Sequence, residues 1–437
     1  MSEQPPGWAE AAVIQLLETT IGGVWGKEPG ANEVDAVVIR VADFRDDGSI
    51  NFDSAPLRSV TPRQLSSREL RVGDILLEKS GGGPTKSVGR VVRMRPTFQP
   101  VVPTNFVQLL RPNDEVVESG FLHWWLWFSH LNGAAAEFQR ATTNIRNLRT
   151  QDYLDRLAPL PPLNEQRRIV AAIEEQLSRL DAADVSLAQA TRRLEGLRQS
   201  SIAGAVNGEW PLVPLVELLV SLRNGLFVSR PAAEPPGVPI FRISAVRPLA
   251  LDVDDIRYAS VDEVASSDFL VSGGDLLFTR YSGNPEYVGA CARVPDGTRP
   301  TLHPDKLIRA VVDREKADPA YLEIAWATGV TRDEIRVRRK TTAGQVGIAG
   351  GQLKSVRVPV PPLEEQRRIV AEVEARLSVI DAMRASIERA QRRSAALRAA
   401  ILELAFRGEL VPQDPSDEPA SILLDRIRAE RERRAAS

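Results

Sequence analysis

Two long segments of the chain carry a narrow stripe of apolar residues among closely spaced acidic and basic residues. The apolar positions recur at intervals of three, four and seven, which is typical of a coiled-coil seam and not of a helix buried in a globular core. The first stripe comprises Ile169, Ile173, Leu177, Leu180, Leu187, Leu194 and Leu197. The second comprises Ile369, Val373, Leu377, Ile380, Ile387, Leu397, Ile401 and Leu404.

Prolines and acidic residues mark where these helices begin. Pro162 and Pro362 suit the start of a helix, and Glu165 and Glu365 add negative charge to its first turn. A helix of about 38 residues extends for roughly 57 Å, too far to be buried in one ordinary domain. Each segment therefore needs a partner of similar length. Antiparallel pairing of the two is economical because a globular segment separates them. The alternative is that each helix packs only on its own domain.

The segments before and between the helices contain short runs of aliphatic and β-branched residues bounded by turns, which predict strands. These runs are 35–41, 88–94 and 106–110 in the first segment, and 239–243, 275–280 and 307–312 in the second. The aromatic run 121–128 is expected to lie on a helix packed against the sheet. Both segments are therefore predicted to be mixed α/β (α+β) domains.

The two halves of the chain repeat each other at an offset of 200 residues. The stretch 160–171 reads Leu-Pro-Pro-Leu-Asn-Glu-Gln-Arg-Arg-Ile-Val-Ala and recurs, with two substitutions, at 360–371. A weaker match upstream relates Gly73-Asp74-Ile75-Leu76 to Gly274-Asp275-Leu276-Leu277. Each half is thus one variable globular domain followed by one closely matched helix, which predicts an approximate internal two-fold relation.

This organisation predicts five parts. They are a globular domain at 1–161, a helix at 162–203, a second globular domain at 204–361, a second helix at 362–407, and a tail with a short helix at 408–437. The expected fold is α/β (mixed α+β), with two globular domains separated by two long antiparallel coiled-coil helices.

Composition narrows the chemistry that this chain can support. The net charge of −2 argues against a generally basic nucleic-acid coat, but it leaves room for a local positive face. Cys291 is the single cysteine, and His123, His130 and His303 show no ligand spacing, so no metal site is expected. The chain shows neither a long apolar run nor a signal-peptide pattern, which favours a cytoplasmic location.

Two short motifs resemble those of enzymes but lack required residues. The stretch 81–87 has Thr85 where a phosphate-binding loop needs glycine, and a strand is expected to follow it. Asn284-Pro285-Glu286-Tyr287 resembles the Asn-Pro-Pro-Tyr of DNA amino-methyltransferases without its second proline, and no glycine-rich methyl-donor loop accompanies it. With no catalytic triad or carboxylate pair in sight, we expect no catalytic residue.

These features together resemble the specificity subunits of type I restriction–modification systems. The resemblance rests on the doubled Pro-Pro-Leu-x-Glu-Gln-Arg-Arg-Ile-Val, on the paired Gly-Asp motifs and on the tail 408–421, and it covers essentially the whole chain. It implies a non-catalytic subunit with two target recognition domains, each of which reads one half of a split, asymmetric DNA site. The helices would act as spacers and dock two methyltransferase subunits. The restriction motor-nuclease subunits would then bind to this assembled core.

The resemblance also implies where cofactors and partners belong. S-adenosylmethionine, ATP and Mg²⁺ would be held by the partner subunits, with none in this chain. The matched starts of the two helices are expected to contact the methyltransferase subunits. These residues are Glu165, Gln166, Arg167, Glu365, Gln366 and Arg367.

Polar and basic side chains on the turn-rich loops are expected to contact double-stranded DNA. In the first domain these are Lys79, Ser80, Gly81 and Lys86. In the second they are Arg280, Tyr281, Asn284, Tyr287, Arg338, Arg339, Lys340, Thr341 and Gln345.

Two other functions stay open. One is a stand-alone DNA adenine methyltransferase with duplicated readers, which the missing donor loop disfavours. The other is a coiled-coil scaffold unrelated to DNA, which the loop motifs disfavour.

Overall fold

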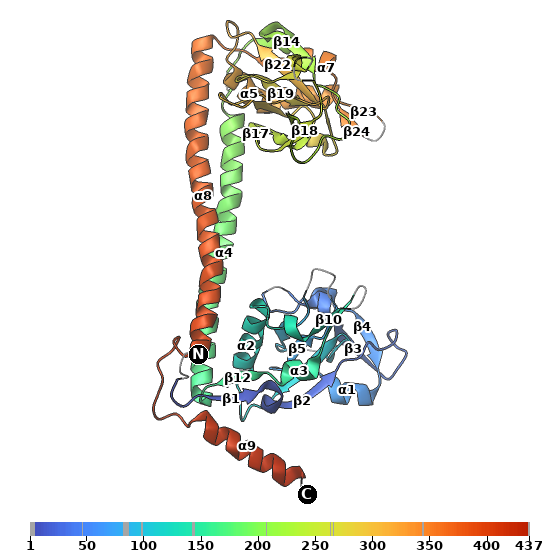
Figure 1. Cartoon of the computed structure of the whole chain (residues 1–437), viewed down its shortest axis with the longest axis vertical. Helices are drawn as coiled ribbons and strands as arrows, with labels where there is room; N and C mark the ends of the chain where they lie inside the picture. The colour runs from blue at the N-terminus through green and yellow to red at the C-terminus, as the bar shows by residue number, and fades with distance from the viewer. Residues whose placement is uncertain are drawn as a thin grey trace. The chain divides into compact units, whose positions relative to one another are not determined.

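The computed structural model describes residues 5–45, 47–81, 87–97, 99–141, 145–206, 208–262, 264, 266–342 and 345–435. The chain divides into two compact units, many of whose elements are labelled in Figure 1. Unit 1 is Met1–Ser186 with Ala390–Ser437, and unit 2 is Leu187–Arg389. Each unit therefore combines one globular part with segments of both long helices.

A four-stranded antiparallel sheet forms the centre of the globular part of unit 1. Its strands, in order, are β2 (Leu17–Gly22), β9 (Val107–Pro112), β5 (Ile75–Glu78) and β7 (Val91–Arg93). Strand β5 is buried along its whole length. Its continuous apolar run suits a central strand that is covered on both faces.

Smaller sheets and short helices surround this sheet. The outer strands are β3 (Val34–Ile39) between β4 (Leu57–Val60) and β8 (Val101–Pro103); β1 (Ala9–Ala12) paired with β12 (Leu157–Leu160); and the three-stranded sheet β10 (Gln139–Ala141), β11 (Arg146–Leu148) and β6 (Ser80–Gly81). The helices are α1 (Pro62–Arg68), α2 (Ser119–Leu131) and α3 (Thr150–Leu154).

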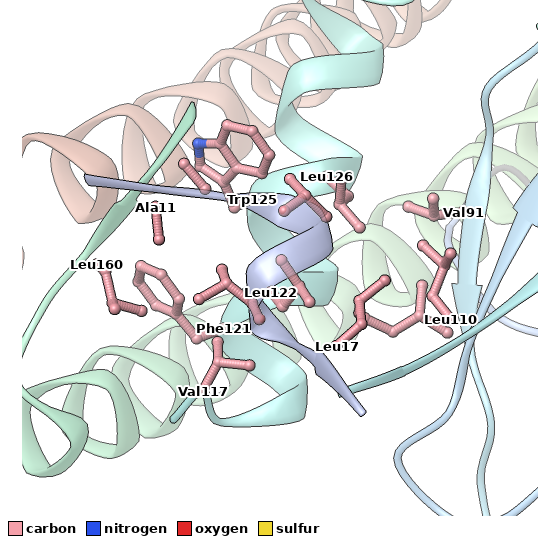
Figure 2. Packing of buried hydrophobic residues seen from close by; sticks show 14 of the residues in the cluster. Ala11, Leu17, Val91, Leu110, Val117, Phe121, Leu122, Trp125, Leu126 and Leu160 are labelled. Carbon is pink, nitrogen blue, oxygen red and sulfur yellow. The ribbon is translucent and has the colours of Figure 1, made fainter. Parts of the chain in front are cut away.

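Helix α2 supplies the aromatic part of the core of unit 1. Phe121 and Trp125 of this helix are buried in one cluster with Leu17 of β2 and Leu110 of β9 (Figure 2). The carboxylate of Glu118 accepts a hydrogen bond of 2.8 Å from the backbone N–H of Phe121, which caps the helix. The expected aromatic helix packed against the sheet is therefore confirmed.

Unit 2 repeats the same plan. Its central sheet has the order β14 (Leu219–Asn224), β22 (Leu307–Val312), β19 (Leu276–Thr279) and β21 (Cys291–Arg293). The other strands are β13 (Leu212–Pro214) with β25 (Arg357–Pro359), β15 (Val238–Phe241) with β18 (Ile256–Ala259), β16 (Val246–Arg247) with β17 (Ala250–Leu251), and the three-stranded sheet β20 (Tyr281–Ser282), β24 (Gln345–Gly347) and β23 (Lys340–Thr342). The helices are α5 (Pro319–Ala327), α6 (Gly329–Arg338) and α7 (Gly350–Lys354).

All six predicted strands occur; the run 307–312 has the same bounds as β22, and the bounds of the other five differ at their ends. The largest difference is in the run 88–94, of which only Val91–Arg93 is strand. Gly89 has a φ of +103°, a left-handed conformation that interrupts the extended chain before β7 begins. The mixed helix-and-strand fold predicted from the sequence is confirmed.

The two matched segments form single long helices, α4 (Leu163–Ala203) and α8 (Leu363–Arg407). They pack together antiparallel, side by side in Figure 1. In unit 1, Arg398 of α8 pairs with Asp181 of α4 at 2.7 Å. In unit 2, Arg198 of α4 pairs with Asp381 of α8 at 2.9 Å. The same ion pair, with the two helices exchanging roles, is what antiparallel pairing of two matched copies produces, so the predicted pairing is confirmed.

Most of the predicted seam residues are buried or partly buried, and three are exposed. Ile169, Ile173 and Leu177 are buried in unit 1, and Ile369 and Val373 are buried in unit 2. The seam predictions for three leucines are wrong, because these side chains are between 39% and 49% exposed: Leu197, Leu397 and Leu404. An α-helix has 3.6 residues per turn, so a stripe with a period of 3.5 drifts around the helix over several turns.

The segment after α8 packs on unit 1. Helix α9 (Ala420–Ala435) places Ala420 and Leu424 in the same core cluster as α2. The backbone N–H of Ala420 donates to the carbonyl of Gly7 at 2.9 Å, and Arg168 pairs with Asp417 at 2.8 Å. The segment from Asp417 to α9 therefore packs against the first residues of unit 1 and against the start of α4.

The compact units cut both long helices, whereas the sequence-based division treats each helix as a part of its own. The helices themselves begin and end within a few residues of the expected bounds. Among the described residues, no helix combines the length and the apolar content that a membrane span needs.

Candidate nucleic-acid interface

The repeated Gly-Asp motif forms a structural turn at the start of the central strands. Asp74 accepts a hydrogen bond of 2.7 Å from the backbone N–H of Arg71 and pairs with Arg111 at 2.7 Å. Asp275 likewise accepts from Ser272 at 2.7 Å and pairs with Arg309 at 2.7 Å. Both carboxylates are almost fully buried. The motif therefore anchors β5 and β19, and with them the loops that follow these strands.

Each central strand leads directly into a three-stranded sheet, and the two three-stranded sheets together hold six of the thirteen DNA-contact candidates. In unit 1, β6 carries Ser80 and Gly81 beside β11, and the hydroxyl of Ser80 donates to Asn147 at 2.7 Å. In unit 2, β20 carries Tyr281 and pairs with β24, the strand of Gln345, which in turn pairs with β23, the strand of Thr341 and Lys340. The structure thus brings together candidates that lie some 60 positions apart in the sequence.

A hollow of about 780 Å³ lies beside this small sheet in unit 1. Ser80 and Gly81 form part of its wall, and the exposed apolar side chains Trp25, Phe106 and Ile145 also line it. Its charged residues are paired. Arg90 pairs with Glu78, which also lines the hollow, at 2.8 Å, and Arg40 pairs with the buried Asp43 at 2.9 Å. The surface that this hollow offers is therefore largely apolar.

A smaller hollow, of about 230 Å³, lies at the matching place in unit 2. Tyr281 and Tyr287 line it together with Arg247 and Lys306. The guanidinium of Arg247 lies over the ring of Tyr287 at 4.8 Å, a cation–π arrangement. The lining contains no carboxylate among the described residues, so this hollow is basic and aromatic.

Other candidates near the hollows are tied to the protein itself. The side chain of Asn284 caps the short turn of helix at 285–287 by accepting from the N–H of Glu286 at 3.0 Å. Arg338 pairs with Glu334 at 2.8 Å, and Arg339 lies 3.5 Å from Glu286. The positive charge of the basic run 336–340 is therefore partly offset by neighbouring acids.

Two lysine or arginine candidates sit just before the small sheets. The ammonium of Lys79 lies 3.4 Å from the amide oxygen of Gln108, and burial lowers the pKa of Lys79. The guanidinium of Arg280 lies 4.9 Å from the ring centre of Tyr281. The candidate Lys86 lies outside the described residues, as do the side chains of Thr341 and Gln345.

Six residues at the starts of the two long helices were predicted to contact partner subunits. The structure shows that some of them are buried and others exposed. Gln166 is fully buried: its amide donates to the carbonyl of Pro161 at 2.9 Å and accepts from the N–H of Glu118 at 2.8 Å. Gln366 makes the equivalent bonds to Pro361 and Asp318, each at 2.8 Å. Both glutamines therefore join a long helix to its own globular part, and their side chains are not presented to a partner.

The neighbouring residues differ between the two helices. Glu165 is buried and accepts a hydrogen bond of 3.0 Å from the indole N–H of Trp8, and burial raises its pKa. Glu365 is more accessible and pairs with Arg368 at 2.7 Å. Arg167 and Arg367 are exposed and remain predicted partner contacts.

Several lining residues of the hollows were not identified from the sequence. Trp25, Phe106 and Ile145 come from three distant segments of unit 1, and Arg247 and Lys306 from two segments of unit 2. The internal repeat offered a signal for one pair, because Phe106 and Lys306 occupy matching positions with very different side chains. Among the described residues, no group of three or more histidine, cysteine or acidic side chains is arranged to hold a metal ion.

Comparison with curated proteins finds full-length relatives of one kind. No family model matches the chain. The chain is 31% identical over 452 residues to the type I restriction enzyme EcoKI specificity subunit of Escherichia coli strain K12, covering 98% of this chain and 96% of that protein. It is 25% identical over 450 residues to the type I restriction enzyme StySPI specificity subunit of Salmonella potsdam, with the same coverage.

Solved structures share the fold at lower identity. A chain from a type I R-M system, in a study of its complex assembly and conformational transition, matches with a TM-score of 0.72 at 22% identity over 94% of this chain and 100% of that chain. The HsdS subunit from Thermoanaerobacter tengcongensis matches with a TM-score of 0.56 at 22% identity, covering 93% and 98%.

Proposed function

Because this chain belongs to the specificity subunits of type I restriction enzymes, we propose that it directs methylation and restriction to one split, asymmetric DNA sequence. The family resemblance noted in the sequence is confirmed by the full-length relatives. Specificity subunits of such systems bind DNA and assemble with other subunits. In this proposal the globular part of unit 1 reads one half of the site and that of unit 2 reads the other.

The observation that carries the proposal is the duplication of one reader with different side chains. Both units have the same central sheet, the same Gly-Asp turn, the same three-stranded sheet and a hollow at the same place. The linings of the hollows differ. Two copies with different linings read two different half-sites, and their target is therefore asymmetric.

The proposal assigns the chemistry to partner subunits. Two methyltransferase subunits dock on the long helices, and Arg167 and Arg367 are the exposed residues among the six predicted helix-start contacts. S-adenosylmethionine, ATP and Mg²⁺ belong to the methyltransferase and motor-nuclease subunits. A stand-alone adenine methyltransferase is not favoured, since the full-length relatives are specificity subunits.

Removal of this chain from a host that keeps its methyltransferase subunits tests the proposal. We expect one two-block methylated motif to vanish from the genome and to return when the chain is supplied again, as read by single-molecule sequencing. The purified chain alone should show neither methyl transfer nor ATP hydrolysis. Persistence of the full methylation pattern without the chain would contradict the proposal.

A further inference from the structure

The two hollows are equivalent in their backbone, which allows their side chains to be compared position by position. The N–H of Lys79 donates to the carbonyl of Phe106 at 3.0 Å, and the N–H of Arg280 donates to that of Lys306 at 2.9 Å. Phe106 and Lys306 each directly precede a central strand, β9 and β22. Phe106 and Lys306 therefore occupy equivalent positions in the linings of the two hollows.

A second pair of lining residues, Glu78 and Thr279, is also equivalent in the backbone. Glu78 and Thr279 end the central strands β5 and β19, and their carbonyls accept from Gly89 at 3.0 Å and Gly289 at 2.8 Å. Glu78 is neutralised by Arg90. Thr279 is only 2% exposed, and its hydroxyl has no hydrogen-bond partner among the described residues.

A second unsatisfied hydroxyl lies in the wall of the unit 2 hollow. Ser244 lines it, and its buried hydroxyl oxygen also has no partner among the described residues. Ser244 is the middle residue of the short helical turn 243–245. The matching turn in unit 1 is 41–43, whose middle residue Ala42 carries no polar side chain. A buried polar atom without a partner costs on the order of 1–3 kcal/mol. A ligand with hydrogen-bonding atoms would satisfy two such hydroxyls beside one hollow.

The charges and apolar groups of the two linings point to different ligands. The unit 2 hollow combines Lys306 and Arg247 with the two free hydroxyls. Arginine and lysine favour the O6 and N7 acceptors of guanine, and serine and threonine hydroxyls serve as additional donors. The unit 1 hollow presents Trp25 and Phe106, which suit an apolar contact with the C5 methyl of thymine.

On the basis of the proposed function, we propose that the two hollows are the base-reading sites of the two units. The hollow of unit 2 takes the major-groove edge of a guanine, and the hollow of unit 1 takes the methyl group of a thymine. Lys306 and Phe106 are the residues that set this difference.

An exchange of Lys306 and Phe106 between the two hollows tests this inference in the assembled complex. The variants Lys306→Phe and Phe106→Lys are each produced together with the methyltransferase subunits, and the methylated motif is mapped by single-molecule sequencing. We expect Lys306→Phe to reduce the preference for guanine at a position of one block by roughly 5- to 150-fold. The other block and the gap should stay unchanged. Phe106→Lys should alter only the other block.

Matched controls separate base reading from other effects. Lys316→Phe changes an exposed lysine of unit 2 that pairs with Asp313 and lies outside the hollow, so it should leave the motif unchanged. Ser244→Ala installs the residue that unit 1 has at this position and removes one hydroxyl. It keeps the test available if Lys306→Phe prevents assembly, and it should weaken discrimination in the same block as Lys306→Phe.

The outcomes distinguish this inference from the proposed function. If both exchange variants keep the wild-type motif, the inference is wrong. A two-block motif in the wild type still supports the proposed function in that case. A uniform loss of DNA affinity across sequences, with a salt dependence reduced by about one ion, would make Lys306 a phosphate contact and also overturn the inference. A wild-type complex without a two-block motif would refute the proposed function itself.

Discussion

Asp74 and Asp275 show how one residue type serves the same purpose in both units. Each carboxylate closes a turn and pairs with an arginine on the neighbouring strand. Removal of one partner from a buried pair leaves an uncompensated charge, which costs about 3–5 kcal/mol. This recurring ion pair therefore stabilises the fold of both units, whereas the linings of the two hollows differ.

Replacement of Asp74 by alanine should destabilise unit 1 by about 3–5 kcal/mol because Arg111 loses its partner. Asp275→Ala should do the same to unit 2 through Arg309. Chemical denaturation of the purified variants measures both effects. The exposed Asp114 offers a control, since Asp114→Ala should change stability by less than about 0.5 kcal/mol. Equal stability of the Asp74 and Asp114 variants would contradict the structural role of the motif.

Two buried histidines make the fold sensitive to acid. Burial lowers the pKa of His123 to about 3 and that of His303 to about 4. In the unfolded chain these histidines are protonated as the pH falls through about 6.5, whereas in the folded chain they stay neutral at that pH. The stability from each neutral imidazole is thus complete above that pH and is lost as the pH falls toward the folded-state pKa.

Between pH 7 and pH 5 each histidine should therefore reduce the free energy of unfolding by about 2 kcal/mol. The variants His123→Phe and His303→Gln should each remove their own share of this loss. Denaturation curves at the two pH values, compared between variant and wild type, measure the difference and cancel other titrating groups. A variant with the full wild-type loss would show that its imidazole is not protected from protonation.

At the level of elements, the paired helices depend on an apolar interface within each unit. Leu177 is buried in the core cluster of unit 1, and Leu377 packs against that of unit 2. Replacement of both by aspartate should lower the helical circular dichroism signal and the melting temperature, because a buried unpaired charge costs several kcal/mol. The matched control is Leu197→Asp with Leu397→Asp, two leucines on the same helices that are nearly half exposed. Equal effects of the two double variants would mean that the interface has been wrongly identified.

The same helices should govern the gap between the two halves of the DNA site. Helices α4 and α8 both run without interruption from one unit into the other. A heptad inserted in each, after Gln189 and after Arg389, leaves the ion pairs Arg198–Asp381 and Arg398–Asp181 in place. It adds roughly 10 Å at 1.5 Å per residue, or about three base pairs of DNA.

We expect methylation mapping to show both blocks unchanged and a longer gap between them. An insertion in α4 alone breaks the pairing of the helices and should abolish methylation instead. An unchanged gap in the doubly lengthened chain would refute a spacer role.

At the level of the whole molecule, the duplication predicts that the two readers act separately. Exchange of residues 212–357 for the same region of a relative should change one block of the recognised sequence and preserve the other. The exchanged segment begins with β13 and ends at the first residue of its partner strand β25, so it carries nearly all of the globular part. Genome-wide methylation mapping reads the result. Alteration of both blocks would show that the two units do not read independently.

The sequence by itself determined the features that arise from local periodicity and from duplication. The length and start of α4 and α8, their antiparallel pairing, the two globular parts and the family all follow from apolar spacing and from a motif repeated 200 residues apart. Helical periodicity is a property of near neighbours in the chain, and a stripe of apolar residues on a long helix requires a partner. No tertiary contact was needed to infer these features.

Only the tertiary structure decided which residues share a surface. Gln166 and Gln366 lie in the most recognisable motif of the chain, yet both are buried and bound to the backbone. Trp25, Phe106 and Ile145 are scattered over 120 positions and line one hollow. Sequence spacing specifies neighbours along one element, whereas strand pairing and loop packing bring together residues from distant segments. The candidate DNA contacts come from such distant segments, and therefore only the folded chain shows which of them lie together.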